Sequence, residues 1–275
     1  MTAALLAGSY AVLLLGLWLF QDKLLYFPDR GPLPAAPAWL SAERVEIPTA
    51  DSLRLIGWVV PARSGAADSP WLLLFHGNAG NIATAGRPDH DLQLSRLGLN
   101  VLALDYRGYG ESQGRPSEPG LYADADAAWH WLTTVRGVPP GRIVIYGHSL
   151  GSAVAIELAT RVEAAGLIVE GAPTSVPDRG QEVYPFLPVR WLSRNRFASK
   201  ERIGRVTCPK LFIHGLNDTT IPIRHGRRLF ELAAEPKKFL AVAGGHDDAY
   251  AVDAESYERG ITRFLVEIGL RPAYP

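Results

Sequence analysis

One short stretch constrains the fold more than any other: residues 143–158 read IVIYGHSLGSAVAIEL. Its first half is an apolar run of β-branched and aromatic residues, which is typical of a fully buried strand. Its second half is a pattern of small and apolar residues that favours a helix. Only Gly-His-Ser-Leu-Gly lies between them, so the chain turns from strand to helix within about two residues. We expect Ser149 to stand at this corner with its hydroxyl group exposed.

Two glycines flank this corner and explain how such a turn is possible. Gly147 and Gly151 carry no Cβ atom, which lets strand and helix approach each other closely while Ser149 adopts strained backbone angles. A G-x-S-x-G sequence in this setting predicts a nucleophile elbow. The alternative is a serine in an ordinary glycine-rich turn, so the rest of the chain must decide between them.

Apolar runs recur along the rest of the chain, with helical patterns between most of them. Two alternating runs, RVEIPTA and LRLIGWVVP, predict a half-exposed antiparallel pair. The later runs predict buried strands: WLLLFHG, LNVLALDYRG, RIVIYGHS, GLIVEGAP, KLFIHG and KFLAVAGG. Strands that alternate with helices predict an α/β fold with a mostly parallel sheet, covered by helices on both sides. Reactive groups in such sheets gather at the carboxyl ends of the strands.

Composition narrows the possible functions. The 275 residues, 47% of them apolar, are enough for one large domain with a sizeable core. Lys plus Arg and Asp plus Glu balance at 28 each, which argues against a nucleic-acid partner. The single cysteine, Cys208, excludes an intramolecular disulfide and a multi-cysteine metal site. We expect neither a metal nor a cofactor.

The first twenty residues carry no charged side chain and, as a helix, extend about 30 Å, enough to cross a bilayer. A cleaved signal peptide is the alternative, but the run lacks a basic start and no A-x-A-like site follows it. We therefore predict a single-pass amino-terminal membrane anchor at residues 1–22, in contact with membrane lipid. A proline-rich connector at residues 23–43 precedes a globular domain at residues 44–275.

Residues 173–206 break the alternation of strands and helices. The segment holds four prolines and seven Arg or Lys against three Asp or Glu. We predict a small cap inserted between two strands. It is either a helical excursion with a solvated basic face or a lid that contacts acyl chains or anionic lipid.

A serine hydroxyl becomes nucleophilic when a base takes its proton and a third group orients that base. His246 follows the last predicted strand and two glycines, so its loop can reach back across the strand ends. His148 adjoins Ser149, but its side chain is expected to point away at a sharp turn. We predict His246 as the base; the alternative is a solvent-exposed loop histidine.

Asp218 is the predicted orienting acid. It follows a strand and lies between Ser149 and His246 in the chain, in the order Ser, Asp, His. Glu170, at the end of the preceding strand, is the alternative.

A glycine-rich loop, LFHGNAGN, follows another apolar strand and can supply backbone N–H groups to an oxyanion. We predict one donor from Leu150, directly after the serine, and a second from Asn78, with Ala79 as the alternative. The loop lacks the lysine and serine of a P-loop and the G-x-G-x-x-G spacing of a dinucleotide site. The serine corner, the acid, the histidine loop and the glycine-rich loop thus each follow a predicted strand, and all four are consistent with nucleophilic attack by an activated serine.

Five segments together carry a family resemblance: HGNAGN, DYRGYGESQGRPSEPGLYADA, GHSLGSAVAIELA, APTSVPD and GGHDD. The chain resembles serine hydrolases of the α/β-hydrolase fold, in a membrane-tethered subgroup related to serine-aminopeptidase-like hydrolases that includes protein depalmitoylases. The resemblance covers nearly the whole chain. It implies an eight-stranded sheet over residues 44–275 and a triad of Ser149, Asp218 and His246.

We therefore expect a membrane-anchored enzyme that needs no cofactor and cleaves carboxylic ester or thioester bonds of acyl or lipid-like substrates through an acyl-enzyme. A serine peptidase or amidase is the alternative enzyme, because the fold hosts several reactions. A non-catalytic domain that binds a partner or lipid is the third possibility.

Overall fold

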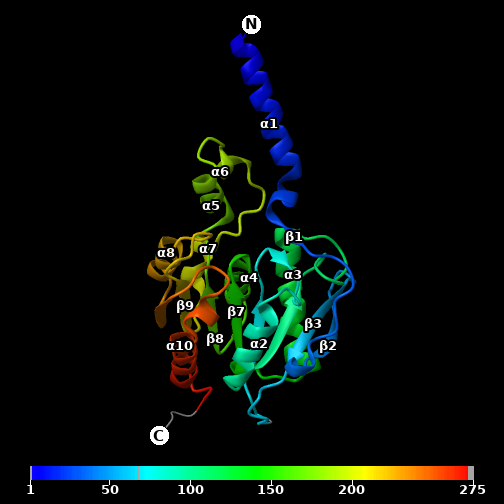
Figure 1. Ribbon diagram of the computed structural model, residues 1–275, viewed down its shortest axis with the longest axis vertical. Coiled ribbons are helices and arrows are strands. Elements are labelled where there is room, and N and C mark those ends of the chain that lie inside the picture. Colours follow the sequence, from blue (N-terminus) through cyan, green and yellow to red (C-terminus); the bar gives the residue numbers. More distant parts are fainter. Residues whose placement is uncertain (1, 67, 272–275) are drawn as a thin grey trace.

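The computed structural model describes residues 2–66 and 68–271, and an eight-stranded sheet forms its centre (Figure 1). The strand order is β10-β9-β8-β7-β4-β6-β3-β2. The strands are β2 (Glu43–Pro48), β3 (Arg54–Val60), β4 (Trp71–Phe75), β6 (Asn100–Asp105), β7 (Ile143–His148), β8 (Gly166–Glu170), β9 (Lys210–Gly215) and β10 (Lys237–Val242). A separate parallel pair joins β1 (Phe27–Pro28) to β5 (Ala79–Gly80).

The sheet is parallel from β10 through β6, whereas β3 runs antiparallel to both β6 and β2. The predicted mostly parallel eight-stranded sheet is therefore confirmed. Edge strand β2 buries Val45 and Ile47 and exposes the residues between and around them, as expected where one face meets water. The central strands β7 and β8 are buried except at His148, the last residue of β7, which is why their sequences are nearly continuous apolar runs.

Helices cover both faces of the sheet. They are α2 (Arg87–Arg96), α3 (Glu118–His130), α4 (Leu150–Ala159), α5 (Val176–Val183), α6 (Val189–Leu192), α7 (Ser199–Arg202), α8 (Arg224–Leu232), α9 (Ala249–Val252) and α10 (Ala254–Glu267). Short 3-10 turns lie at Ala38–Leu40, Pro140–Arg142 and Ile203–Arg205, and a π-helical turn lies at Trp131–Val135. Side-chain caps begin several helices: Ser117 accepts a hydrogen bond at the start of α3, Ser175 at α5 and Asp253 at α10.

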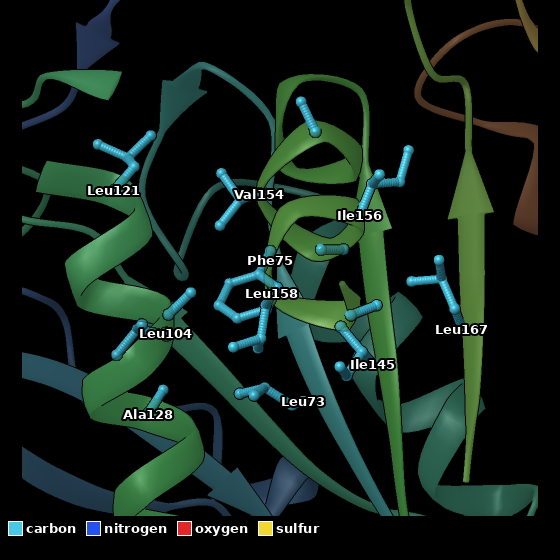
Figure 2. Packing of buried hydrophobic residues seen from close by; sticks show 14 of the residues in the cluster. Leu73, Phe75, Leu104, Leu121, Ala128, Ile145, Val154, Ile156, Leu158 and Leu167 are labelled. Carbon is cyan, nitrogen blue, oxygen red and sulfur yellow. The ribbon is translucent and has the colours of Figure 1, made fainter. Parts of the chain in front are cut away.

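The alternation of side chains along β7 builds two cores, one on each face of the sheet. Ile143 and Ile145 join the core beneath α3 and α4, while Val144 and Tyr146 join the core beneath α2 and α10. Figure 2 shows the first core, where Phe75 and Ile145 of the sheet lie against Leu158 of α4. Burying each such side chain contributes about 1.5–3 kcal/mol, so these layers hold the strand ends in place.

The amino-terminal helix α1 (Thr2–Leu25) projects away from the domain (Figure 1). Its segment Ala4–Leu25 is long and apolar enough to cross a membrane, and its most apolar stretch is not buried in the protein. The predicted amino-terminal hydrophobic helix is thus present, and it continues to Leu25, beyond the expected end at residue 22. Between β8 and β9, the segment at residues 173–206 forms α5, α6 and α7, and α5 and α6 lie at the same end of the domain as α1.

Candidate active site

Ser149 stands at the corner between β7 and α4 with φ 54° and ψ −121°. Both flanking glycines are required by close contacts. A Cβ atom at Gly147 would lie 2.4 Å from the Gly151 carbonyl oxygen, and one at Gly151 would lie 2.1 Å from the Phe75 carbonyl oxygen. The Ser149 N–H donates to the carbonyl of Glu170 at 2.9 Å, which ties the corner to β8. The strained turn inferred from the sequence is therefore present in the backbone.

His246 connects Ser149 to Asp218 through both of its ring nitrogens. Nε2 lies 2.8 Å from the Ser149 hydroxyl, and Nδ1 lies 2.7 Å from Oδ2 of Asp218. Burial alone raises the pKa of Asp218, but the hydrogen bond and charge of His246 and the N–H of Ile221 outweigh it and lower this pKa. An ionised Asp218 accepts a hydrogen bond from Nδ1–H of His246, so Nε2 is left unprotonated and can accept the proton of Ser149.

Glu170, the alternative acid, points elsewhere. Its carboxyl group accepts hydrogen bonds from the hydroxyls of Tyr146 and Tyr257, which belong to the core beneath α2 and α10. Burial raises the pKa of Glu170 to about 7. Its backbone does reach the corner, because its carbonyl also accepts the Ser152 hydroxyl at 2.9 Å. Of the two candidate acids, the structure brings only Asp218 to His246.

The two predicted oxyanion donors lie beside Ser149. Neither the Asn78 N–H nor the Leu150 N–H donates a hydrogen bond to any described residue, and both residues border the same cavity as Ser149. The loop before Asn78 packs closely on the elbow, since a Cβ atom at Gly77 would lie 3.8 Å from the Ser149 hydroxyl oxygen. Two unpaired backbone donors beside a serine can stabilise a developing oxyanion.

The Asn78 loop is held by residues that the sequence analysis did not single out. The Asn78 carbonyl accepts the Tyr109 hydroxyl at 2.7 Å and the Phe27 N–H at 2.9 Å, while the Asn78 side-chain amide donates to the Leu25 carbonyl at 2.7 Å. Leu25 is the last residue of α1 and Phe27 is the first residue of β1, and no local pattern marks them for this contact. Pairing of β1 with β5 completes the support.

The His148 ring contacts His246, and its hydrogen bond is to the backbone of His246 and not to the Ser149 hydroxyl. Burial lowers the pKa of His148 to about 4, so the ring is neutral near pH 7 and its Nε2 lies 2.8 Å from the His246 carbonyl oxygen. Its ring centroid lies 5.0 Å from that of His246. This contact with the loop of the predicted base was missed, although the adjacency of His148 to Ser149 was a signal for it.

Potential metal ligands near the site are few. His148, His246 and Asp247 place ligand atoms within 4.8 Å of one another. Both ring nitrogens of His246, however, are hydrogen-bonded to Ser149 and Asp218. We assign no metal site to these residues.

A largely apolar cavity of about 710 Å³ opens at Ser149. Ser149, Leu150 and Asn78 border one part of it, and the remaining walls come mainly from α1, the residues after it, and the segment at residues 173–206. A cavity of this size and apolar character suits a ligand with a long hydrocarbon part, placed so that a carbonyl group can meet the serine.

Comparisons with known proteins agree with this fold. The family described as alpha/beta hydrolase fold matches residues 70–202. An uncharacterized protein of Mycobacterium tuberculosis is 43% identical over 253 residues, covering 91% of this chain and 89% of that protein. Alpha/beta hydrolase domain-containing protein 17B of Homo sapiens is 36% identical, covering 72% of this chain and 68% of its own. An esterase of Pyrococcus furiosus superposes with a TM-score of 0.73 at 22% identity, covering 88% of this chain and 100% of that one. The chain belongs to the alpha/beta hydrolase family.

Proposed function

We propose that this protein is a membrane-anchored serine hydrolase that cleaves ester or thioester bonds of acyl or lipid-like substrates. One observation carries the proposal: the hydrogen-bonded chain from Ser149 through His246 to Asp218 borders a largely apolar cavity of about 710 Å³. Such a chain prepares a serine for attack on a carbonyl group, and the apolar walls favour a hydrocarbon substituent on that carbonyl.

In the first half of the reaction, the Ser149 oxygen attacks the acyl carbonyl while its proton passes to Nε2 of His246. The negative oxygen of the tetrahedral intermediate accepts hydrogen bonds from the N–H groups of Asn78 and Leu150, each donor lowering the barrier by about 3 kcal/mol. Asp218 stays ionised and stabilises the positive imidazolium ring. His246 then gives its proton to the departing alcohol or thiol, which leaves an acyl group on Ser149.

In the second half, His246 takes a proton from water as that water attacks the acyl-enzyme. The second tetrahedral intermediate uses the same two N–H donors. Its collapse breaks the bond to Ser149, which recovers its proton from His246, and releases the carboxylic acid.

The cavity and the helix α1 suggest the substrate class. An anchor at α1 confines the site to the neighbourhood of a bilayer, where acyl chains are abundant, and the apolar walls gain free energy from each methylene group that they bury. We therefore propose membrane-embedded or lipid-attached substrates, with medium or long acyl chains preferred over acetyl.

A fluorophosphonate probe tests the proposed nucleophile. The full-length protein in detergent micelles should be labelled at Ser149, and Ser149→Ala should abolish labelling. Ser64→Ala, at an exposed serine in a loop outside the cavity, is the matched control and should label like the wild type. Labelling that persists in Ser149→Ala would overturn the assignment. A panel of acyl esters, acyl thioesters and aminoacyl amides then ranks the reactions, and faster turnover of the amides would replace the proposed esterase by an amidase.

A further inference from the structure

The cavity at Ser149 uses α1 as one of its walls. Leu17, Trp18 and Leu24 of α1 line it from one side, although α1 otherwise projects away from the domain. Val183 and Leu187 line it from the side of the cap. A chain that enters between α1 and the cap therefore reaches Ser149 along a largely apolar lining.

Polar contacts fasten α1 to the cap along most of its length. The Tyr10 hydroxyl donates to the Phe186 carbonyl at 3.0 Å, and the Asn195 side chain donates to the Asp22 carboxylate at 2.7 Å. Arg194 forms an ion pair with the same carboxylate at 3.4 Å. These contacts hold α1 against the cap at Tyr10 and at Asp22, on either side of the residues Leu17 and Trp18 that line the cavity.

This attachment places the cap at the depth of the membrane. The segment of α1 that is long and apolar enough to cross a membrane is Ala4–Leu25, and Tyr10 lies within it. Tyr10 is about 9 Å along the helix from the start of that segment, whereas the hydrocarbon core of a bilayer is about 30 Å thick. An α1 that crosses the membrane with this segment therefore brings Tyr10, and the Phe186 carbonyl that it contacts, into the membrane.

The outermost part of the cap, residues 183–191, which we call the cap tip, carries large apolar side chains into solvent. Trp191 is 91% exposed and Phe186 is 70% exposed, with Val183 and Tyr184 also exposed. The exposed Arg190 lies beside Trp191 in the sequence, and arginine and tryptophan together are typical of a membrane interface. These side chains cost free energy in water and gain it in lipid.

The backbone of the cap tip is also suited to an apolar medium. Every carbonyl of residues 184–188 accepts a hydrogen bond from within the protein: the Gln181 amide reaches those of Tyr184, Pro185 and Leu187, Tyr10 reaches that of Phe186, and backbone N–H groups reach that of Pro188. Pro185 and Pro188 carry no N–H, and among the described residues only the Phe186 N–H of this stretch has no partner. A loop in water needs no such satisfaction, whereas a loop in lipid does.

We propose that the cap tip inserts into the membrane beside α1, so that the cavity opens into the lipid and receives the acyl chain of its substrate from there. The acyl chain then passes between α1 and the cap to Ser149 without crossing water. This inference rests on the proposed function, and it adds that α1 is a specificity-determining wall of the substrate site.

Tryptophan quenching tests the insertion. The full-length protein carrying Trp18→Phe is reconstituted into phosphatidylcholine liposomes with brominated acyl chains, which quench indoles that lie in the lipid. We expect part of the emission to be quenched, and the quenched part to disappear when Trp191→Phe is added. Trp39→Phe, at an exposed tryptophan beside α2, is the matched control and should leave the quenching in place. Unquenched emission from protein that floats with the liposomes would overturn the insertion, whereas protein that does not float would overturn the proposed anchor instead.

Acyl-chain selectivity tests whether α1 forms a wall of the substrate site. Leu17→Trp places a larger side chain in the cavity, while Leu19→Trp, on the same helix but outside the cavity lining, is the matched control. We expect the ratio of kcat/KM for nitrophenyl dodecanoate to that for nitrophenyl acetate to fall at least tenfold in Leu17→Trp and to stay within twofold of wild type in Leu19→Trp. Equal ratios in both variants would overturn the role of α1. A wild-type protein that hydrolyses neither ester would overturn the proposed function itself.

Discussion

Replacing Ser149 by glycine should stabilise the folded protein relative to replacing it by alanine. At φ 54° and ψ −121°, Ser149 holds its Cβ atom in a backbone region that side chains rarely adopt. A residue kept in such a region costs about 1–3 kcal/mol. Alanine keeps the Cβ atom and glycine removes it, while both lose the same hydrogen bond to His246. The comparison therefore isolates the cost of the backbone conformation.

Glycine also makes the unfolded chain more flexible, which offsets about 0.4–1 kcal/mol of this gain. From the middle of both ranges, the free energy of unfolding should be about 1.3 kcal/mol higher for Ser149→Gly than for Ser149→Ala. Each kcal/mol shifts Tm by about 2–4 °C in a domain of this size, so we expect Tm to rise by about 3–5 °C.

Urea titration of the full-length protein in detergent micelles, followed by tryptophan fluorescence, measures this difference. The midpoint should rise for Ser149→Gly while the slope stays the same. Thr160, which ends α4 with φ −77° and ψ −11°, is the control: there glycine should be less stable than alanine by about 0.5–1 kcal/mol. Equal or lower stability of Ser149→Gly than of Ser149→Ala would refute the inference that the elbow stores strain.

The two acidic residues near the elbow lead to two further predictions. Asp218→Asn should lower kcat by up to about 10⁴-fold because His246 loses its orienting carboxylate, whereas Glu170→Gln should lower kcat far less. Steady-state kinetics with one activated ester measures both effects. The reverse ranking of the two variants would make Glu170 the orienting acid. Because burial raises the pKa of Glu170 to about 7, its contribution to stability is present at low pH and lost as pH rises from about 4.5 to about 7. In urea titrations, the free energy of unfolding of Glu170→Gln should therefore rise relative to that of the wild type by about 3 kcal/mol between about pH 4.5 and about pH 7. A difference between the two proteins that does not change with pH would contradict this prediction.

Much of the fold and of the core of the candidate site follows from local patterns. The strands β7, β8 and β9 are short apolar runs that end in a titratable residue or a glycine, and β4 is an apolar run that precedes the glycine-rich loop. The elbow at Ser149 requires its two glycines for steric reasons. Chain order and the glycines before His246 were enough to propose the three side chains that the structure brings within hydrogen-bonding distance. Such features are encoded by neighbours in sequence, so a single chain reveals them.

The walls of the cavity and the support of the Asn78 loop could not be predicted in this way. Tyr109 lies 31 residues from Asn78, and Tyr10 lies 176 residues from Phe186. Neither contact leaves a periodic or compositional pattern, because each depends on how distant elements pack. The hydrophobic character of α1 was evident, but a uniformly apolar helix does not show which of its side chains face a cavity and which face lipid.

The contacts at the carboxyl end of α1 link the position of this helix to the chemistry of the site. The Leu25 carbonyl and the Phe27 N–H both bond to Asn78, whose own N–H is the proposed donor to the oxyanion. A shift of α1 relative to the domain therefore moves both a wall of the cavity and the loop that stabilises the transition state. Deleting the helix would remove the proposed anchor and the wall together and would disturb the loop, so lost activity in such a truncation could not be assigned to any one of them. Single substitutions at Leu17 and Leu19 leave the proposed anchor and the loop contacts in place, and for that reason they separate the proposed role of α1 in selectivity from its proposed role in tethering.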